Sequence, residues 1–284
     1  MGPALASSGR RPSLAAMDQS PARRHGAIQW RASGREAIAR DTPAETPVAI
    51  SFQGRPHTVV MATPADIEDL ALGFTITEGV AAFGDILGLE IKSAPEGLMA
   101  DLRLRGVDRR ARPRTLEGRS SCGLCGVQRL ADAVRPLPAA PEGAVFRHQA
   151  VQRAVAALEA RQPLGRATRA THAAAFADRD GRLVLVREDV GRHNALDKLA
   201  GALARGAVAA AEGFVVVTSR CSFEMVEKTA RIGAPMLVAV SAPTDLAIGK
   251  AEEAGLTLVA LARADGHAVF TRADRLVETV EAAA

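Results

Sequence analysis

Two cysteines three positions apart carry the clearest chemical signal in the chain, within the segment Ser-Cys-Gly-Leu-Cys-Gly at residues 121–126. Glycines surround both thiols, so an exposed and mobile loop is predicted. From Arg103 to Arg119, seven arginines stand against Asp108 and Glu117, and positive charge near a thiol favours the nucleophilic thiolate. A thiolate can take up a sulfane sulfur as a persulfide and pass it to an acceptor. The motif therefore favours sulfur transfer.

Zinc binding and dithiol redox chemistry are the alternatives for this pair. Zinc needs four ligands, or three and a water, usually from a second C-x-x-C or a close pair of histidines. Cys221 stands alone 96 residues beyond Cys125, and neither His148 nor His172 has a partner at short spacing. A thioredoxin-like pair normally follows an early strand, whereas this one follows an arginine-rich loop in mid-chain. No metal site is predicted, and Cys221 and His172 are interpreted as structural residues.

A second dense segment spans residues 187–198, where a predicted strand passes into a helix. Asp189, Arg192, His193 and Asn194 lie together within six residues of one another. This mixture of charge and hydrogen-bonding groups suits a polyanionic ligand, and we predict a binding role. An ordinary capped helix with solvated charges is the alternative.

The elements that position these groups alternate along the second half of the chain. Strands are predicted at 183–186, 214–218, 236–240 and 256–261, and helices at 192–204, 223–232 and 244–254. This rhythm is typical of an α/β layered domain, in which ligands bind beyond the carboxyl ends of the strands. Ser219, Arg220 and Ser241 occupy two such ends and are candidate phosphate contacts, with helix capping as the alternative.

The first half predicts a smaller α+β unit. Strands at 48–52 and 57–61 flank Gln53-Gly54 as a hairpin, and residues 85–105 are predicted to be extended. Between them a helix is predicted to follow Thr63, its proposed N-terminal cap. Residues 1–27 lack apolar periodicity and are predicted to form a disordered basic tail.

Composition limits the classes of function. The 284 residues are 48% hydrophobic, and no apolar run has the length of a membrane helix, so a cytoplasmic protein with no membrane partner is predicted. The net charge of +4 comes mostly from residues 1–24, which carry four arginines against Asp18. Because nucleic-acid affinity rests on a broad phosphate-contacting surface, no nucleic-acid partner is predicted.

Several long motifs resemble the FdhD family of formate dehydrogenase accessory sulfurtransferases. The resemblance extends over residues 28–276 in family order. It is carried by Pro47-Val-Ala-Ile, Ala71-Leu-Gly-Phe-Thr-Ile-Thr-Glu-Gly79, the Cys-Gly-Leu-Cys-Gly run from Cys122, Thr171-His-Ala-Ala-Ala, Glu188-Asp-Val-Gly-Arg-His-Asn-Ala-Leu-Asp-Lys198, Ser219-Arg-Cys-Ser-Phe-Glu-Met225 and Val238-Ala-Val-Ser-Ala-Pro-Thr244.

The resemblance implies a concrete activity. A cysteine desulfurase would donate sulfur to Cys122 as a persulfide, with Cys125 assisting. The sulfur would pass to Mo-bis(molybdopterin guanine dinucleotide) before the cofactor enters formate dehydrogenase. A homodimer is also implied. The implied architecture is α/β, with a smaller N-terminal α+β domain (28–138) ending in the cysteine loop and a three-layer, cytidine-deaminase-like domain (139–284).

The resemblance also implies a cofactor-binding stretch near the end of the chain. It corresponds to Leu261, Ala262, Arg263, Ala264, Asp265 and Gly266. Relatives tend to carry a Gly-Arg pair and a Tyr where this chain has Asp265-Gly266 and Phe270. A non-catalytic chaperone of the molybdenum cofactor is one alternative. A zinc-dependent deaminase-like enzyme is disfavoured, because deaminases carry Glu two residues after a ligand His, and His148, His172 and His193 lack it.

Overall fold

The computed structural model describes residues 20–106 and 136–278. The hairpin predicted around Gln53-Gly54 is present in it. Strands β3 (Thr46–Phe52) and β4 (Arg55–Ala62) pair antiparallel around Gln53 and Gly54, which both have positive φ. Strand β5 (Ile86–Ala94) pairs antiparallel with β6 (Gly97–Leu104), and β6 pairs parallel with β3. The result is a four-stranded sheet in the order β4-β3-β6-β5.

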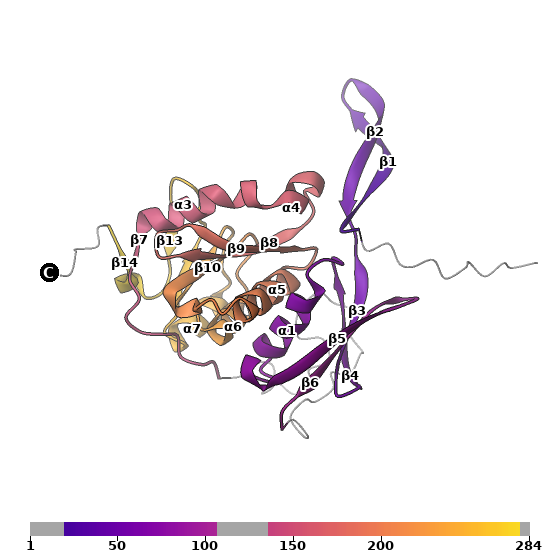
Figure 1. The fold of residues 1–284 in the computed structure, drawn as a ribbon. Helices are drawn as coiled ribbons and strands as arrows, with labels where there is room; N and C mark the ends of the chain where they lie inside the picture. The colour runs from indigo at the N-terminus through magenta and orange to yellow at the C-terminus, as the bar shows by residue number, and fades with distance from the viewer. Residues whose placement is uncertain (1–19, 107–135, 279–284) are drawn as a thin grey trace, which may run out of the picture.

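Helix α1 (Ile67–Thr77) covers one face of this sheet (Figure 1). Its Phe74 packs in a core with Ile50 and Leu102 from the strands beneath it. The predicted cap is wrong: Asp66, in the left-handed region, precedes the helix, and Thr63 bonds instead to the second half of the chain. The local sequence suggested a cap because Thr commonly fills that role. In the structure, the Thr63 N–H instead donates to the distant Asp189 carboxylate.

A six-stranded sheet forms the centre of the second unit, in the order β13-β12-β11-β10-β8-β9. Its strands are β8 (His172–Asp178), β9 (Leu183–Asp189), β10 (Gly213–Val217), β11 (Met236–Ala239), β12 (Thr257–Ala260) and β13 (Ala268–Val269). Because β8 runs antiparallel to both β9 and β10, and β10, β11 and β12 are parallel, four strands end at one edge.

Helices cover both faces of this sheet (Figure 1). One face carries α3 (His148–Leu158) and α4 (Pro163–Thr168), and the other carries α5 (Arg192–Arg205), α6 (Phe223–Ile232) and α7 (Asp245–Glu253). Two separate apolar cores fill the layers, and all five residues of β10 are buried. The unit is therefore a three-layer α/β/α domain, as predicted; β8, α3 and α4 were not predicted. The described residues contain no helix with the length and apolarity to cross a membrane.

Short elements complete the described chain. β7 (Phe146–Arg147) pairs parallel with β14 (Leu276–Val277). Single 3₁₀ turns lie at Phe83–Asp85, Glu159–Arg161, Ala210–Glu212 and Ala273–Arg275.

The two units meet where α1 packs on α5, and two glycines permit the close approach. A Cβ on Gly73 would lie 1.6 Å from the Asp197 carbonyl oxygen, and a Cβ on Gly201 would lie 2.0 Å from that of Asp69. A side chain at either position would push the helices apart. This contact therefore fixes how the N-terminal sheet sits against the α/β/α domain.

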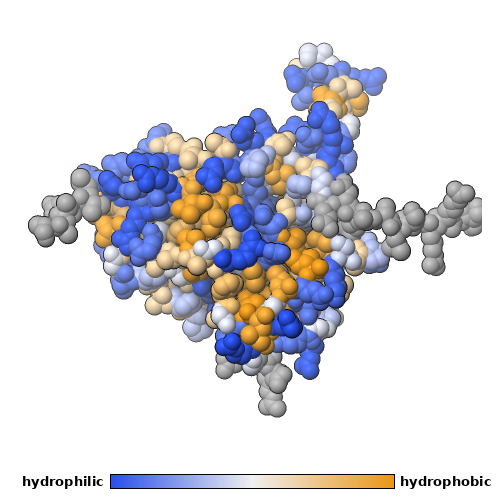
Figure 2. Space-filling view, in the orientation of Figure 1, coloured by the Kyte–Doolittle hydropathy of each residue, from blue (hydrophilic) through white to orange (hydrophobic). Residues whose placement is uncertain are grey.

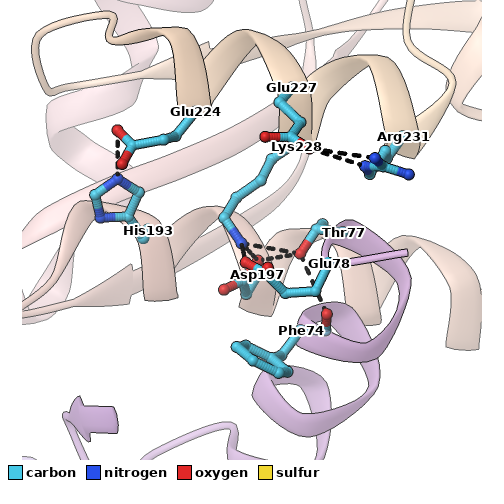
Figure 3. A network of polar contacts seen from close by, with 9 residues as sticks. All are labelled: Phe74, Thr77, Glu78, His193, Asp197, Glu224, Glu227, Lys228 and Arg231. Carbon is cyan, nitrogen blue, oxygen red and sulfur yellow. Dashed lines mark hydrogen bonds and ion pairs between the residues drawn. The ribbon is translucent and has the colours of Figure 1, made fainter. Parts of the chain in front are cut away.

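Buried charge also crosses this interface (Figure 3). Lys228 Nζ lies 2.7 Å from Asp197 Oδ1 and 3.1 Å from Glu78 Oε1, and it donates to Thr77 Oγ1 at 3.0 Å. Burial alone would lower the pKa of Lys228, but the Asp197 and Glu78 carboxylates outweigh it and raise that pKa. The pKa of Asp197 is raised, chiefly by burial and also by the Glu78 charge, against the lowering effect of Lys228. Each buried charge in this cluster therefore has a partner of opposite sign.

The predicted disordered tail extends too far into the chain. Strands β1 (Ala22–Arg31) and β2 (Gly34–Pro43) form an antiparallel hairpin that projects from the body of the molecule (Figure 1). Polar composition suggested disorder because the segment buries little, yet ten backbone pairs hold it in register. The rest of the predicted tail, residues 1–19, lies outside the described residues.

Candidate functional site

The carboxyl edge of the six-stranded sheet gathers the predicted ligand-binding segments. Asp189 ends β9, and residues 219–220 follow β10. Ser241 follows β11, and Leu261 follows β12. The backbone N–H of Leu261 donates to the Ser241 carbonyl at 3.2 Å, so the last two segments are joined directly. Residues up to 72 positions apart in the sequence, from Asp189 to Leu261, therefore come together at one edge.

Asp189 is fully buried and its carboxylate is fully engaged by the protein. Oδ2 lies 2.6 Å from Lys198 Nζ and accepts from the Thr63 N–H at 3.0 Å. Oδ1 accepts from the Gly191 N–H at 2.8 Å and from Asn194 Nδ2 at 3.0 Å. These bonds fasten the start of α5 to the N-terminal unit, so the carboxylate acts as an anchor.

Asn194 has the same anchoring character. Its Nδ2 also donates to the Met61 carbonyl at 2.7 Å, and its side chain is largely buried. Lys198 Nζ donates in addition to the carbonyls of Thr63 and Glu188. The sequence predicted a ligand role for Asp189 and Asn194. In the structure, their side chains make hydrogen bonds and an ion pair with other residues of the protein. Lys198 and Thr63, which complete the anchor, were not predicted.

Arg192 differs from these anchored neighbours. It is half-buried, and its Nε is shielded from solvent without a hydrogen-bond partner in the described part of the chain. Burial, followed by the charges of Arg192 and His193, lowers the pKa of His172. The Arg192 charge thus acts at this edge, and the nearby Asp189 carboxylate is paired with Lys198. A partly desolvated cation without a counter-charge is the electrostatic signature of an anion-binding site.

His193 faces the start of the next helix (Figure 3). Its Nε2 lies 3.3 Å from Glu224 Oε2, which also accepts from Ser222 Oγ at 2.8 Å. These contacts bring the N-termini of α5 and α6 together, and neither helix has a side-chain cap. Free N–H groups at helix starts favour anions. Glu224 was not predicted, although its place in the first turn of a predicted helix was a usable signal.

The remaining predicted contacts at this edge differ in exposure. Ser219 is buried, and its Oγ donates to the Arg220 carbonyl at 3.0 Å. Arg220 is exposed and Ser241 is half-buried. Thr244 caps α7, since its Oγ1 accepts from the Ala247 N–H. Thr244 is therefore a helix cap. Arg220, in contrast, is exposed to solvent.

The predicted cofactor stretch 261–266 forms a tight turn beside the edge. The Arg263 N–H donates to the Gly266 carbonyl at 2.7 Å, and Arg263 Nη1 donates to the carbonyls of Val240 and Ala262. Leu261 has a φ of 53° and is 48% exposed. The guanidinium thus supports the turn itself.

Two histidines outside the predicted set adjoin this turn. His267 Nε2 and His148 Nδ1 lie 2.7 Å apart, with the rings stacked. Burial and then His148 lower the pKa of His267. The pairing of His148 with His267 was not predicted, because 119 residues separate them in the sequence.

The predicted catalytic residues Cys122 and Cys125 lie outside the described residues. Cys221 is described, and it is buried and free, as predicted. Burial raises the pKa of its thiol to about 12, so it is an apolar filler with no thiolate chemistry. Across the described ranges, 20–106 and 136–278, no three His, Cys, Asp or Glu side chains group as metal ligands.

Fold and site together define a class of protein: a two-unit α/β protein that gathers polar segments and a partly buried arginine at the carboxyl edge of its larger sheet. Residues 43–277 match the model of the FdhD/NarQ family. The chain belongs to this family.

Similar proteins support the assignment. A relative from Variovorax paradoxus, named sulfur carrier protein FdhD, is 48% identical over 82% of this chain and 85% of its own length. One of the same name from Agrobacterium fabrum is 47% identical over 84% of this chain and 90% of its own. A crystal structure from Desulfotalea psychrophila, provisionally described as a formate dehydrogenase accessory protein, aligns with a TM-score of 0.71 and 26% identity. That alignment covers 90% of this chain and 99% of the other.

Proposed function

We propose that this protein is a sulfur carrier that serves formate dehydrogenase. In this proposal a cysteine desulfurase loads Cys122 with a persulfide, and the sulfur passes to Mo-bis(molybdopterin guanine dinucleotide), the substrate. Sulfur-carrier relatives of 46–48% identity support the general activity. Arg192 Nε, buried at the carboxyl edge without a partner among residues 20–106 and 136–278, supports a polyanion as the bound species. A homodimer and a cytidine-deaminase-like second domain remain predictions of the same proposal.

The carboxyl edge suits the phosphates of a guanine dinucleotide. Arg192 supplies a cation, and the N-termini of α5 and α6 supply free N–H groups beside it. Phosphate oxygens would satisfy the buried Arg192 Nε, which lacks a partner in the described chain. The 261–266 turn would add backbone groups on the neighbouring strand end. Positive charge and free donors thus converge where a pyrophosphate would sit.

The cysteine segment leaves the described chain far from this edge. Residue 104 ends β6 beside the β3–β4 turn, at the end of the sheet away from Thr63. On the far side, the Ala140 N–H donates to the Ala254 carbonyl, which precedes the amino end of β12. Cys122 is 14 residues from position 136. A chain of that length can span at most about 48 Å, and the proposal requires that the edge lie within this reach.

The sulfur steps balance as thiol exchange. The Cys122 thiolate attacks the terminal sulfur of the desulfurase persulfide, forming Cys122–S–SH and releasing the desulfurase thiolate. Delivery as sulfide needs two electrons. Attack of the Cys125 thiolate on the Cys122 sulfur supplies them, forming a Cys122–Cys125 disulfide and releasing HS⁻ to the molybdenum.

Replacement of Cys122 by Ala tests the proposal. After incubation with a cysteine desulfurase and cysteine, mass spectrometry should find a persulfide adduct of one sulfur on the wild type and none on the variant. The Cys221→Ala variant is the matched control and should keep the adduct, because that thiol is buried. Coexpressed formate dehydrogenase should lose activity only with Cys122→Ala. A Cys122→Ala variant that still matures the enzyme would leave a non-catalytic cofactor chaperone as the function.

A further inference from the structure

The β1–β2 hairpin is an exposed arm with no core beneath it. None of its 20 strand residues is buried, and it stands away from both units (Figure 1). A two-stranded hairpin by itself is marginally stable in water. Its long register therefore indicates that another surface covers it in a complex.

One face of the arm is apolar. Ile28 and Trp30 lie on the same side of β1, opposite Ala37 and Arg35 of β2. Ile28 is 58% exposed and Trp30, the only tryptophan in the chain, is 71% exposed. Figure 2 shows apolar side chains on the projecting arm among hydrophilic ones. Trp and Arg side by side are the residue types most often found as interface hot spots.

The arm is also basic. The hairpin contains five arginines and two acidic residues, which give it a net charge of +3. The arginines are Arg23, Arg24, Arg31, Arg35 and Arg40, and the acidic residues are Glu36 and Asp41. Like charges would repel if two copies of the arm met, so an acidic partner surface fits better than a second copy of this chain.

The base of the arm lies at the carboxyl edge. Strand β2 contacts α4, whose Leu164 and Gly165 N–H groups donate to the Glu188 carboxylate at 3.0 and 2.6 Å. Glu188 directly precedes Asp189. A protein that takes a ligand from this edge would therefore meet the arm. The flank of the cysteine segment at residue 104 lies at the opposite end of the N-terminal sheet, and the other flank lies near the amino end of β12.

We propose that the apolar face of the β1–β2 hairpin docks the protein that receives the cofactor, a cofactor-free formate dehydrogenase with an acidic surface. This inference rests on the proposed function. The family model begins at residue 43, where β2 ends, so the arm lies outside the matched core.

Binding of full-length protein to cofactor-free formate dehydrogenase tests the proposal. Trp30→Ala should weaken the complex about 30-fold, as expected for a hot spot, and Trp30→Phe should restore most of the affinity. His25→Ala, on the opposite face of the same strand, is the matched control and should bind like the wild type. Raising the salt concentration should weaken wild-type binding, since the arm is basic.

Other readouts separate this proposal from the proposed function. Trp30→Ala should still bind guanosine diphosphate and still load persulfide on Cys122. Unchanged affinity of Trp30→Ala for the dehydrogenase would overturn the docking assignment, as would weaker binding to the cysteine desulfurase alone or a change in oligomeric state. Loss of persulfide in Cys122→Ala with no loss of maturation would instead overturn the sulfur-carrier function.

Discussion

The α1–α5 interface and the carboxyl edge both remove charged side chains from water, but Lys228 at the interface is paired with carboxylates, whereas Arg192 at the edge is not paired with any described carboxylate. Lys228 meets Asp197 and Glu78 at the interface, and helices approach through Gly73 and Gly201. At the edge, Arg192 keeps a buried nitrogen with no partner in the described residues. Buried charges that hold a fold together are paired, whereas a binding site keeps charge available for its ligand.

The largest effect is expected from filling the helix contact. Gly73→Ala should lower the free energy of unfolding by more than about 4 kcal/mol, because its Cβ would overlap a backbone carbonyl of α5. Urea denaturation measures this. Gly249→Ala in α7 is the matched control: nothing lies within 4 Å of its Cβ, and the helix should gain about 0.5–1 kcal/mol. Equal stabilities would show that the helices do not pack this closely.

Removing the cation of the buried anchor should come next. Lys198→Met leaves the Asp189 carboxylate with its N–H donors but no counter-charge, and should cost about 3 kcal/mol of unfolding free energy. Lys92→Met, which breaks an exposed pair with Glu90, should cost under about 1 kcal/mol. Calorimetry of both variants checks the contrast, and similar losses would argue against the anchor.

Replacing Arg192 by Ala tests whether the carboxyl edge serves ligand binding rather than stability. Guanosine diphosphate should bind about 10-fold more weakly, since a charge-assisted phosphate contact is lost. Stability should stay within about 0.5 kcal/mol, because the described structure shows no bond to break. Arg182→Ala, exposed in the β8–β9 turn, should affect neither quantity in titration calorimetry and urea denaturation. A large loss of stability in Arg192→Ala would assign it a structural role.

The smallest effect concerns pH. Burial and the adjacent cations lower the pKa of His172 below its ordinary value of 6.5, so the unfolded chain takes up a proton first as the pH falls. Stability should therefore decline below pH 6.5 until the lowered pKa is reached, by less than about 1.4 kcal/mol per pH unit for this group. His172→Gln should reduce that slope, and exposed His25→Gln should not. Part of the slope should persist, because the pKa of His267 is lowered too.

Local pattern sufficed where one element buries one face. The helix predicted at 223–232 has those bounds in the structure, and the strands around Gln53-Gly54 form as expected. The carboxyl-edge rule predicted that residues 219, 220 and 241 lie at one edge of the sheet, and the structure has them just after β10 and β11. Periodicity and strand order carry this information because they depend on near neighbours.

Long-range pairing could not be predicted in the same way. Thr63 looked like a helix cap, yet its N–H meets a carboxylate 126 residues away. Asp189 and Asn194 had the composition of ligand residues and proved to be anchors. The hairpin at 22–43 was not predicted, because its large apolar side chains are few and arginines are scattered through both strands.

The sequence by itself determined the family, the thiol pair and the alternation that builds an α/β/α domain. Tertiary structure alone decided which charged residues form ion pairs between the two units and which have no partner among the described residues at the edge. The reason is physical: residue type sets what a side chain can do, whereas burial and distant partners set what remains available for a ligand.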